Sequence, residues 1–334
     1  MLPNDIATCL RLSDIYGVVR ARGIEERMRE WLIDLMLTDR SWGSVVESDT
    51  ASEPICFGSC IFISDGLARE LEQSKHPFLL ADLCTETSLR SHILTFEEIK
   101  VASRKSSLNF FGGLFTFARI QPGAQPVKFV QAMNHLQDGL LTSMAGFGIK
   151  SYFKQTYESN QVARWFKNSL MRKKFGAEHL SNYSSHEAAS LGSHSPNLFG
   201  YRKADPLLKM GTPVGELLYS GVPELGIPAS LRMALKLELD GLAGDLLAQA
   251  LGKGEGTLDS NWASGLSKLN MRMDRNPIQP GRPWTREAVR SYIRNNLHEL
   301  DVLPHLGDGE KAHWRSLNLL PSKATCGTLS PRRL

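Results

Sequence analysis

The chain of 334 residues exceeds the roughly 250 to 300 residues at which a single hydrophobic core stops growing, so its length predicts two structural units. Hydrophobic residues make up 42% of the sequence and charged residues 22%, a composition that excludes a largely disordered chain. The net charge of +4 permits an acidic partner such as nucleic acid without requiring one.

Several classes of protein and of site are excluded by what the sequence lacks. No apolar run reaches the roughly 18 residues that a membrane-spanning helix needs, so we expect no membrane partner. The first residues lack the basic start and apolar block of a signal peptide, which predicts a cytoplasmic location. The five cysteines and nine histidines show no metal-ligand spacing. We therefore expect reduced thiols, and no metal, cofactor or catalytic residue.

The first part of the chain carries helical and strand patterns in turn. Apolar residues recur at helical spacing over residues 24–37, which predicts an amphipathic helix. Residues 43–47 and 55–63 are typical of the two strands of a hairpin, with a polar turn between them. Gly58 interrupts the alternation of the second strand, and this predicts a β-bulge near it.

The same unit is expected to continue with one more strand and a long helix. Residues 110–120 alternate poorly, which is typical of a strand that is buried on both faces. Residues 127–157 are predicted to be mostly helical, with a break near Gly146 and Gly148. The resulting order of helix, hairpin, strand and helix predicts an α+β domain over residues 1–180.

A serine-rich joint follows this domain. Residues 181–196 contain six serines and end in proline, which predicts a linker within a connecting segment over residues 181–226. Strand signals are absent after it, and leucine and alanine with short glycine breaks predict an all-helical unit. We divide this unit into a helix-turn-helix at 227–275 and a basic helical extension at 276–334.

Three helices fit residues 227–275. The first is expected to end at Asp240 and Gly241, and the second at Gly252. The third carries an apolar stripe that must pack on the other two helices, formed by Leu258, Trp262, Leu266 and Leu269. The short connection before the third helix predicts a steep crossing, which would let that helix lie in the major groove of DNA.

This stretch resembles the DNA-binding domain of the LuxR/GerE family of bacterial transcription regulators. The matching residues are Ala234-Leu235, Asp240-Gly241, Leu247-Ala248, Leu251-Gly252, Glu255-Gly256-Thr257-Leu258 and Lys268-Leu269 followed by Met271. The resemblance implies a recognition helix over about 256–269 that binds double-stranded DNA in a regulator, which we expect to be a homodimer. The chain departs from the family's pattern at Lys253 and Asp259.

Nine residues are the predicted DNA contacts. Asn261 would read adenine. Contacts with phosphate groups, or with DNA next to that base, would come from Thr257, Ser260, Ser264, Lys268 and Arg272. Because residues 227–275 hold six basic and six acidic side chains, further phosphate contacts must come from elsewhere. Arg286, Arg290 and Arg294 recur every four residues, and they form either a phosphate-contacting ridge or an ordinary solvated helix face.

The N-terminal domain suggests a second hypothesis. Its element order resembles the GNAT acyltransferase fold, an α/β sandwich that binds acetyl coenzyme A. The nearest match to that family's phosphate-binding loop is Ser143-Met144-Ala145-Gly146-Phe147-Gly148, although these glycines are also typical of a simple helix break. The alternative to a regulator is therefore an acyltransferase that uses acetyl coenzyme A and carries an accessory helical domain.

Other interpretations also stay open. In a regulator, the N-terminal domain would sense a small-molecule or protein effector. The neutral helix-turn-helix is also compatible with a protein-interaction module. The run at 164–175 mixes basic and aromatic residues, and it is either a nucleic-acid contact or a solvated helix. Cys56 and Cys60 are expected to be core thiols rather than nucleophiles.

Overall fold

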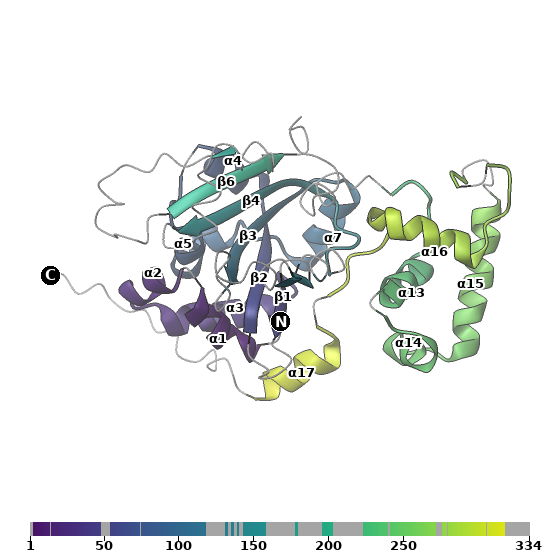
Figure 1. Cartoon of the computed structure of the whole chain (residues 1–334), viewed down its shortest axis with the longest axis horizontal. Helices are drawn as coiled ribbons and strands as arrows, with labels where there is room; N and C mark the ends of the chain where they lie inside the picture. Colours follow the sequence, from purple (N-terminus) through teal and green to yellow (C-terminus); the bar gives the residue numbers. More distant parts are fainter. Residues whose placement is uncertain are drawn as a thin grey trace.

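The computed structural model contains a mixed α/β unit and a helical unit that lie next to each other (Figure 1). It describes residues 3–13, 15–47, 54–73, 75–117, 131–132, 135–136, 139, 143–157, 178–179, 196–202, 223–239, 241–271, 276–278, 280–304 and 306–317. None of the helices within these ranges is long and apolar enough to cross a bilayer.

A mixed sheet forms the centre of the first unit. Its strands are β1 (Ser41–Glu47), β2 (Pro54–Ile63), β3 (Leu108–Phe117), β4 (Ile149–Tyr157), β5 (Glu178–His179) and β6 (Pro196–Arg202). They are arranged in the order β1-β2-β3-β4-β6-β5. β3 and β4 run parallel, whereas every other neighbouring pair is antiparallel. The expected mixture of helices and strands is therefore confirmed.

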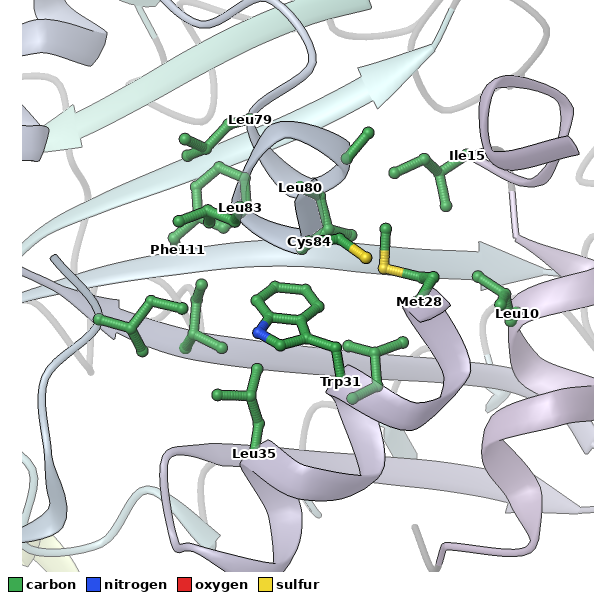
Figure 2. Close-up of a cluster of buried hydrophobic side chains, with 14 of the residues drawn as sticks. Leu10, Ile15, Met28, Trp31, Leu35, Leu79, Leu80, Leu83, Cys84 and Phe111 are labelled. Carbon is green, nitrogen blue, oxygen red and sulfur yellow. The ribbon is translucent and has the colours of Figure 1, made fainter. Parts of the chain in front are cut away.

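Helices cover both faces of the sheet, and all of them except α7 contribute to a first core, whereas Ile99 of α7 lies in a second one. They are α1 (Asp5–Leu12), α2 (Tyr16–Ala21), α3 (Glu25–Leu37), α4 (Asp65–Glu72), α5 (Leu79–Thr85), α6 (Thr87–Arg90) and α7 (Phe96–Arg104). Trp31 of α3 lies at the centre of a buried cluster between α5 and the sheet, near Leu83 and Phe111 (Figure 2). The amphipathic helix expected at 24–37 is thus confirmed, with its apolar side in this core.

A second core lies on the other face of the sheet. Because successive strand residues point to opposite faces, Phe111 joins the first core while Phe110 joins the second. Three rings form the centre of the second core, with the centroids of Trp42 and Phe62 each 5.0 Å from that of Phe147. Phe147 precedes β4, so the segment that leads into this strand closes the core.

The predicted hairpin is confirmed as β1 and β2, and the predicted bulge lies close to Gly58. The register between β2 and β3 passes from Leu114 opposite Ser59 to Gly112 opposite Cys60. The extra residue is therefore Gly113 on β3. It lies on the strand next to β2, which carries Gly58. A glycine at this place lets the strand bend without a side chain to accommodate.

The prediction of a mostly helical segment at 127–157 is wrong over its last part, which forms β4. Residues 151–155 are all buried, including Lys154 and Gln155. A strand buried on both faces shows no alternation of apolar and polar residues, so its pattern resembles that of a helix. The expected break is confirmed, because Gly146 adopts a positive φ of 90° just before the strand.

The predicted linker boundary is also wrong. β6 lies inside the segment assigned to the linker, yet it pairs with β4 from Pro196 to Arg202 and contributes Leu198 and Phe199 to the two cores. The sheet unit therefore extends beyond residue 180, and strands are not confined to the part before the serines. The serine run at 181–195 and the basic run at 164–175 lie outside the described residues.

The helical unit has a core of its own. Its elements are α13 (Ala229–Leu239), α14 (Gly244–Ala250), α15 (Glu255–Asn270), α16 (Arg286–Asn295) and the 3-10 turn η3 (Leu297–Glu299). Leu231, Leu235, Trp262, Trp284 and Ile293 form the centre of that core. Helices are therefore confirmed as the regular elements of the described residues from 223 to 317.

The last helix, α17 (Asp308–Ser316), returns to the sheet unit (Figure 1). Lys311 forms a buried ion pair with Asp39, and Trp314 joins the first core of the sheet unit. The Arg315 guanidinium also donates to the carbonyl oxygen of Leu37 over 3.1 Å. The chain thus leaves the sheet unit, forms the helical unit and then docks on the sheet unit again.

Candidate nucleic-acid interface

The turn between α14 and α15 has a structure that explains its sequence. Gly252 follows the end of α14 with φ of 60°, a left-handed conformation that glycine adopts without strain. The N–H of Lys253 donates to the carbonyl oxygen of Ala248 over 2.9 Å, which is the hydrogen bond of a Schellman motif. α15 then begins at Glu255, so only a few residues separate the two helices.

One face of α15 packs into the helical core. Trp262 is only 3% exposed and Leu269 is also buried, while Leu258 and Leu266 are half-buried. Gly265 permits a close approach to α13, because a Cβ atom at this position would lie 2.6 Å from Cδ2 of Leu231. The predicted apolar stripe is confirmed, and it fixes which side of α15 faces outward.

The outward face of α15 brings together four of the predicted contact residues. Thr257, Ser260, Ser264 and Lys268 are all exposed, and their spacing of three or four residues places them on one side of the helix. α15 lies at the far end of the molecule from the sheet unit, so this face is not covered by that unit (Figure 1). We call these four residues the α15 face.

Asn261 does not belong to this face. Its side chain is half-buried, and its amide nitrogen is buried without a hydrogen-bond partner among the described residues. The adenine contact predicted for Asn261 would therefore require a different rotamer. Arg272, another predicted contact, lies outside the described residues.

Two of the three arginines in the predicted ridge are used inside the helical unit. Arg286 pairs with Asp259 over 2.8 Å, and Arg290 pairs with Glu238 over 2.8 Å. Both guanidinium groups also lie over the Trp262 ring, at 5.4 and 5.2 Å from its centroid. The hydrogen bond with Glu238 raises the pKa of Arg290. These two residues therefore join α16 to α13 and α15.

Arg294 is the member of the ridge that faces solvent. It is exposed, and no ion pair with it is found in the part of the chain that the structure describes. Asp259, which pairs with Arg286, is a carboxylate of α15 that neutralises a cation from the following helix. Arg294 and Lys268 are thus cations that remain available to a phosphate group.

The loop compared with a phosphate-binding loop has another role. Residues 144–149 are buried, and the loop leads into β4 rather than into a helix. The Lys236 ammonium donates to the carbonyl oxygen of Ala145, and the Ser103 hydroxyl donates to that of Gly146. The loop therefore joins α7 to α13, and its glycines are explained by a break before β4 without a pyrophosphate.

The described residues contain no cluster of three or more histidine, cysteine or acidic side chains that could hold a metal ion. Cys9, Cys56, Cys60 and Cys84 are free and buried. Burial raises the pKa of Cys56 to about 12 and raises that of Cys60 as well. The description of Cys56 and Cys60 as core thiols is therefore supported by their surroundings.

The buried thiols lead to a labelling prediction. In the folded chain at pH 8, we expect Cys56 and Cys60 to react at least about 100-fold more slowly with iodoacetamide than an exposed cysteine, because the reactive thiolate is scarce and covered. Mass spectrometry of peptides from briefly labelled protein measures this, with urea-unfolded protein as the fully reactive control. Fast labelling of either residue in the folded chain would contradict the buried assignment.

Comparisons of the chain with known protein families, with curated proteins and with solved structures find no match.

Proposed function

We propose that this chain is a DNA-binding transcription regulator of the LuxR type, with α15 as its recognition helix. The observation that carries the proposal is the α15 face, a row of short polar side chains that ends in Lys268 on a helix whose opposite side is fixed in a core. Short side chains allow a helix backbone to approach base edges closely, and a 16-residue helix of about 24 Å fits a major groove.

The proposal also includes a fold for the sheet unit. We assign it a GNAT-like arrangement, supported by the position of α3 before the β1–β2 hairpin and of β3 beside that hairpin in the sheet. In the proposed regulator this unit senses an effector or binds a protein partner. The buried loop at 143–148 gives no support to the acyltransferase alternative.

Electrostatics predicts how the helical unit would bind DNA. Arg286 and Arg290 are already paired, so phosphate contacts depend on a small number of cations such as Lys268 and Arg294. A protein that neutralises few phosphates binds weakly, and its affinity falls less steeply with salt than that of a strongly basic protein. Two copies on one duplex would double these contacts, which favours a homodimer on a site with two halves.

The proposal is tested with the full chain and a pool of random duplexes. Rounds of selection at low salt, followed by fluorescence anisotropy on the enriched sequences, should yield a preferred duplex that is bound more tightly than an unrelated one. If no duplex is bound even at low salt, DNA binding is excluded, and the α15 face is better explained as a contact with another protein.

Lys268 provides a specific prediction. Replacing it by alanine should weaken binding to all duplexes and reduce the slope of log affinity against log salt by about 0.9 for each phosphate group that the lysine neutralises. Lys105→Ala is the matched control, because Lys105 is also an exposed lysine but lies at the end of α7 in the sheet unit. An equal reduction of affinity in both variants would show that only total charge matters, and would remove Lys268 from the interface.

A further inference from the structure

A groove of about 400 Å³ lies on the surface of the helical unit. It is formed by the end of α13, the connection that follows it, the start of α14 and the second half of α16. α13 packs against both of the other helices (Figure 1). Among the described residues, none of α15 and none of the sheet unit lines this groove. The groove is therefore left unfilled by the rest of the described chain, and it is separate from the α15 face.

Most of the groove lining is apolar. Five aliphatic side chains contribute to it, namely Leu235, Leu239, Leu242, Leu247 and Ile293. Two charged residues of the lining, Glu238 and Arg290, form an ion pair with each other over 2.8 Å. Their charges are therefore satisfied inside the helical unit. A partner that covers this groove would gain free energy mainly by removing aliphatic surface from water.

An exposed apolar stripe runs beside the groove along α14. Ala243, Leu246 and Ala250 are all exposed, and their spacing of three and four residues places them on one side of this helix. Leu246 is 65% exposed, and Ala243 also lines the groove, so the stripe and the groove are continuous. A projecting leucine beside an apolar hollow makes a surface self-complementary. With a twofold axis between two copies, Leu246 of each copy can enter the groove of the other.

Two opposite charges flank the same surface. Arg294, in the last turn of α16, lines the groove and is exposed, and Asp245, in the first turn of α14, is exposed next to Leu246. Neither forms an ion pair within the described part of the chain. The twofold arrangement lets each Arg294 pair with Asp245 of the other copy, and the other N–H groups of the guanidinium stay available to a phosphate group. We propose that the groove and Leu246 form the interface through which two copies of this chain associate.

The size of this surface determines how strongly the copies associate. The groove and the stripe involve only parts of three helices, so we expect a weak dimer rather than an obligate one. A duplex with two half-sites would hold two copies close together and would therefore strengthen the contact. That role on DNA rests on the proposed function, whereas association of two copies without DNA does not.

The experiment is analytical ultracentrifugation of the full chain without DNA, from low micromolar to several hundred micromolar protein. The average mass should rise with concentration from the 37.1 kDa of the monomer toward that of a dimer. A chain that keeps the monomer mass over the whole range would overturn the proposal.

A change at Leu246 tests the surface. Leu246→Asp should raise the dissociation constant of the dimer at least about tenfold, because it would place a carboxylate in the apolar groove of the other copy. Val101→Asp is the matched control, since Val101 on α7 is also an exposed aliphatic residue, with 57% exposure. Both positions are on the surface, so both variants should fold, which circular dichroism checks. Equal dissociation constants for the two variants would refute the assigned surface.

A charge swap tests the twofold arrangement. Arg294→Glu should weaken the dimer about tenfold, because symmetry places two pairs of carboxylates together, and Asp245→Arg/Arg294→Glu should restore most of the affinity. Arg20→Glu, also at an exposed arginine in the last turn of a helix, is the control. A double variant that associates no better than Arg294→Glu would refute the arrangement. A chain that forms this dimer but binds no duplex would refute only the DNA proposal.

Discussion

Lys311→Met is expected to lower the free energy of unfolding by about 3 kcal/mol, because it removes one partner of a buried ion pair. The Lys311 and Asp39 side chains are only 7% and 11% exposed, and Asp39 lies in a left-handed conformation at the end of α3. Methionine retains most of the volume of lysine, so the change isolates the charge. The carboxylate of Asp39 then stays buried without its ammonium partner.

Urea unfolding followed by circular dichroism measures this effect. The double variant Asp39→Asn/Lys311→Met should recover much of the stability, because neither of these two positions then carries a charge. Lys150→Met is the control, since the pair of Lys150 with Asp65 is exposed and its removal should change stability by less than about 0.5 kcal/mol. If Lys311→Met behaves like Lys150→Met, α17 does not dock on the sheet unit as described.

Two kinds of element in the sheet unit were predictable from the sequence. One is a helix with one face exposed to solvent, and the other is a pair of strands joined by a recognisable turn. α3 shows its core-facing residues at helical spacing, and β1 and β2 flank a polar turn. α7 was not predicted. Its signal was present, because Thr95 and Glu98 form a capping box at its start. That pattern would have placed the helix that carries Lys100 and Arg104.

β4 and β6 were not predictable from local pattern. β4 is buried on both faces between β3 and β6, so neighbouring residues such as Phe153 and Lys154 are equally covered and no period appears. β6 is a short strand that follows a serine-rich run, and its burial comes from pairing with β4 about 45 residues earlier in the chain. In both strands, tertiary pairing outweighs local propensity.

In the candidate interface, the features that depend on local sequence were predictable, and the contacts between distant residues were not. The apolar stripe on α15 is a local period, so the sequence indicated which side of the helix faces outward. The pairing of Arg286 with Asp259 and of Arg290 with Glu238 joins residues 27 and 52 positions apart, and no spacing within α16 reveals it. An arginine ridge on one helix can therefore be a phosphate contact or a link between helices, and only its neighbours decide which.

The second large effect is expected at Gly148, where alanine should lower the free energy of unfolding by about 3 kcal/mol. A Cβ atom at this position would lie 2.1 Å from the carbonyl oxygen of Ser103 and 2.7 Å from Cα of Ser106. Both are backbone atoms, so no side-chain rotation relieves the overlap. The Gly148 N–H also donates to the Ser103 hydroxyl over 2.9 Å, so moving the two segments apart breaks a buried hydrogen bond.

The overlap would push the end of α7 away from the start of β4, because Ser103 and Ser106 lie at the end of this helix and just after it. Gly309→Ala is the matched control, since nothing lies within 4 Å of a Cβ atom at that position in α17. Removing a helical glycine should raise stability by up to about 1 kcal/mol, so the two alanines should shift the urea midpoint in opposite directions. Shifts of the same sign would mean that α7 and β4 do not touch at Gly148.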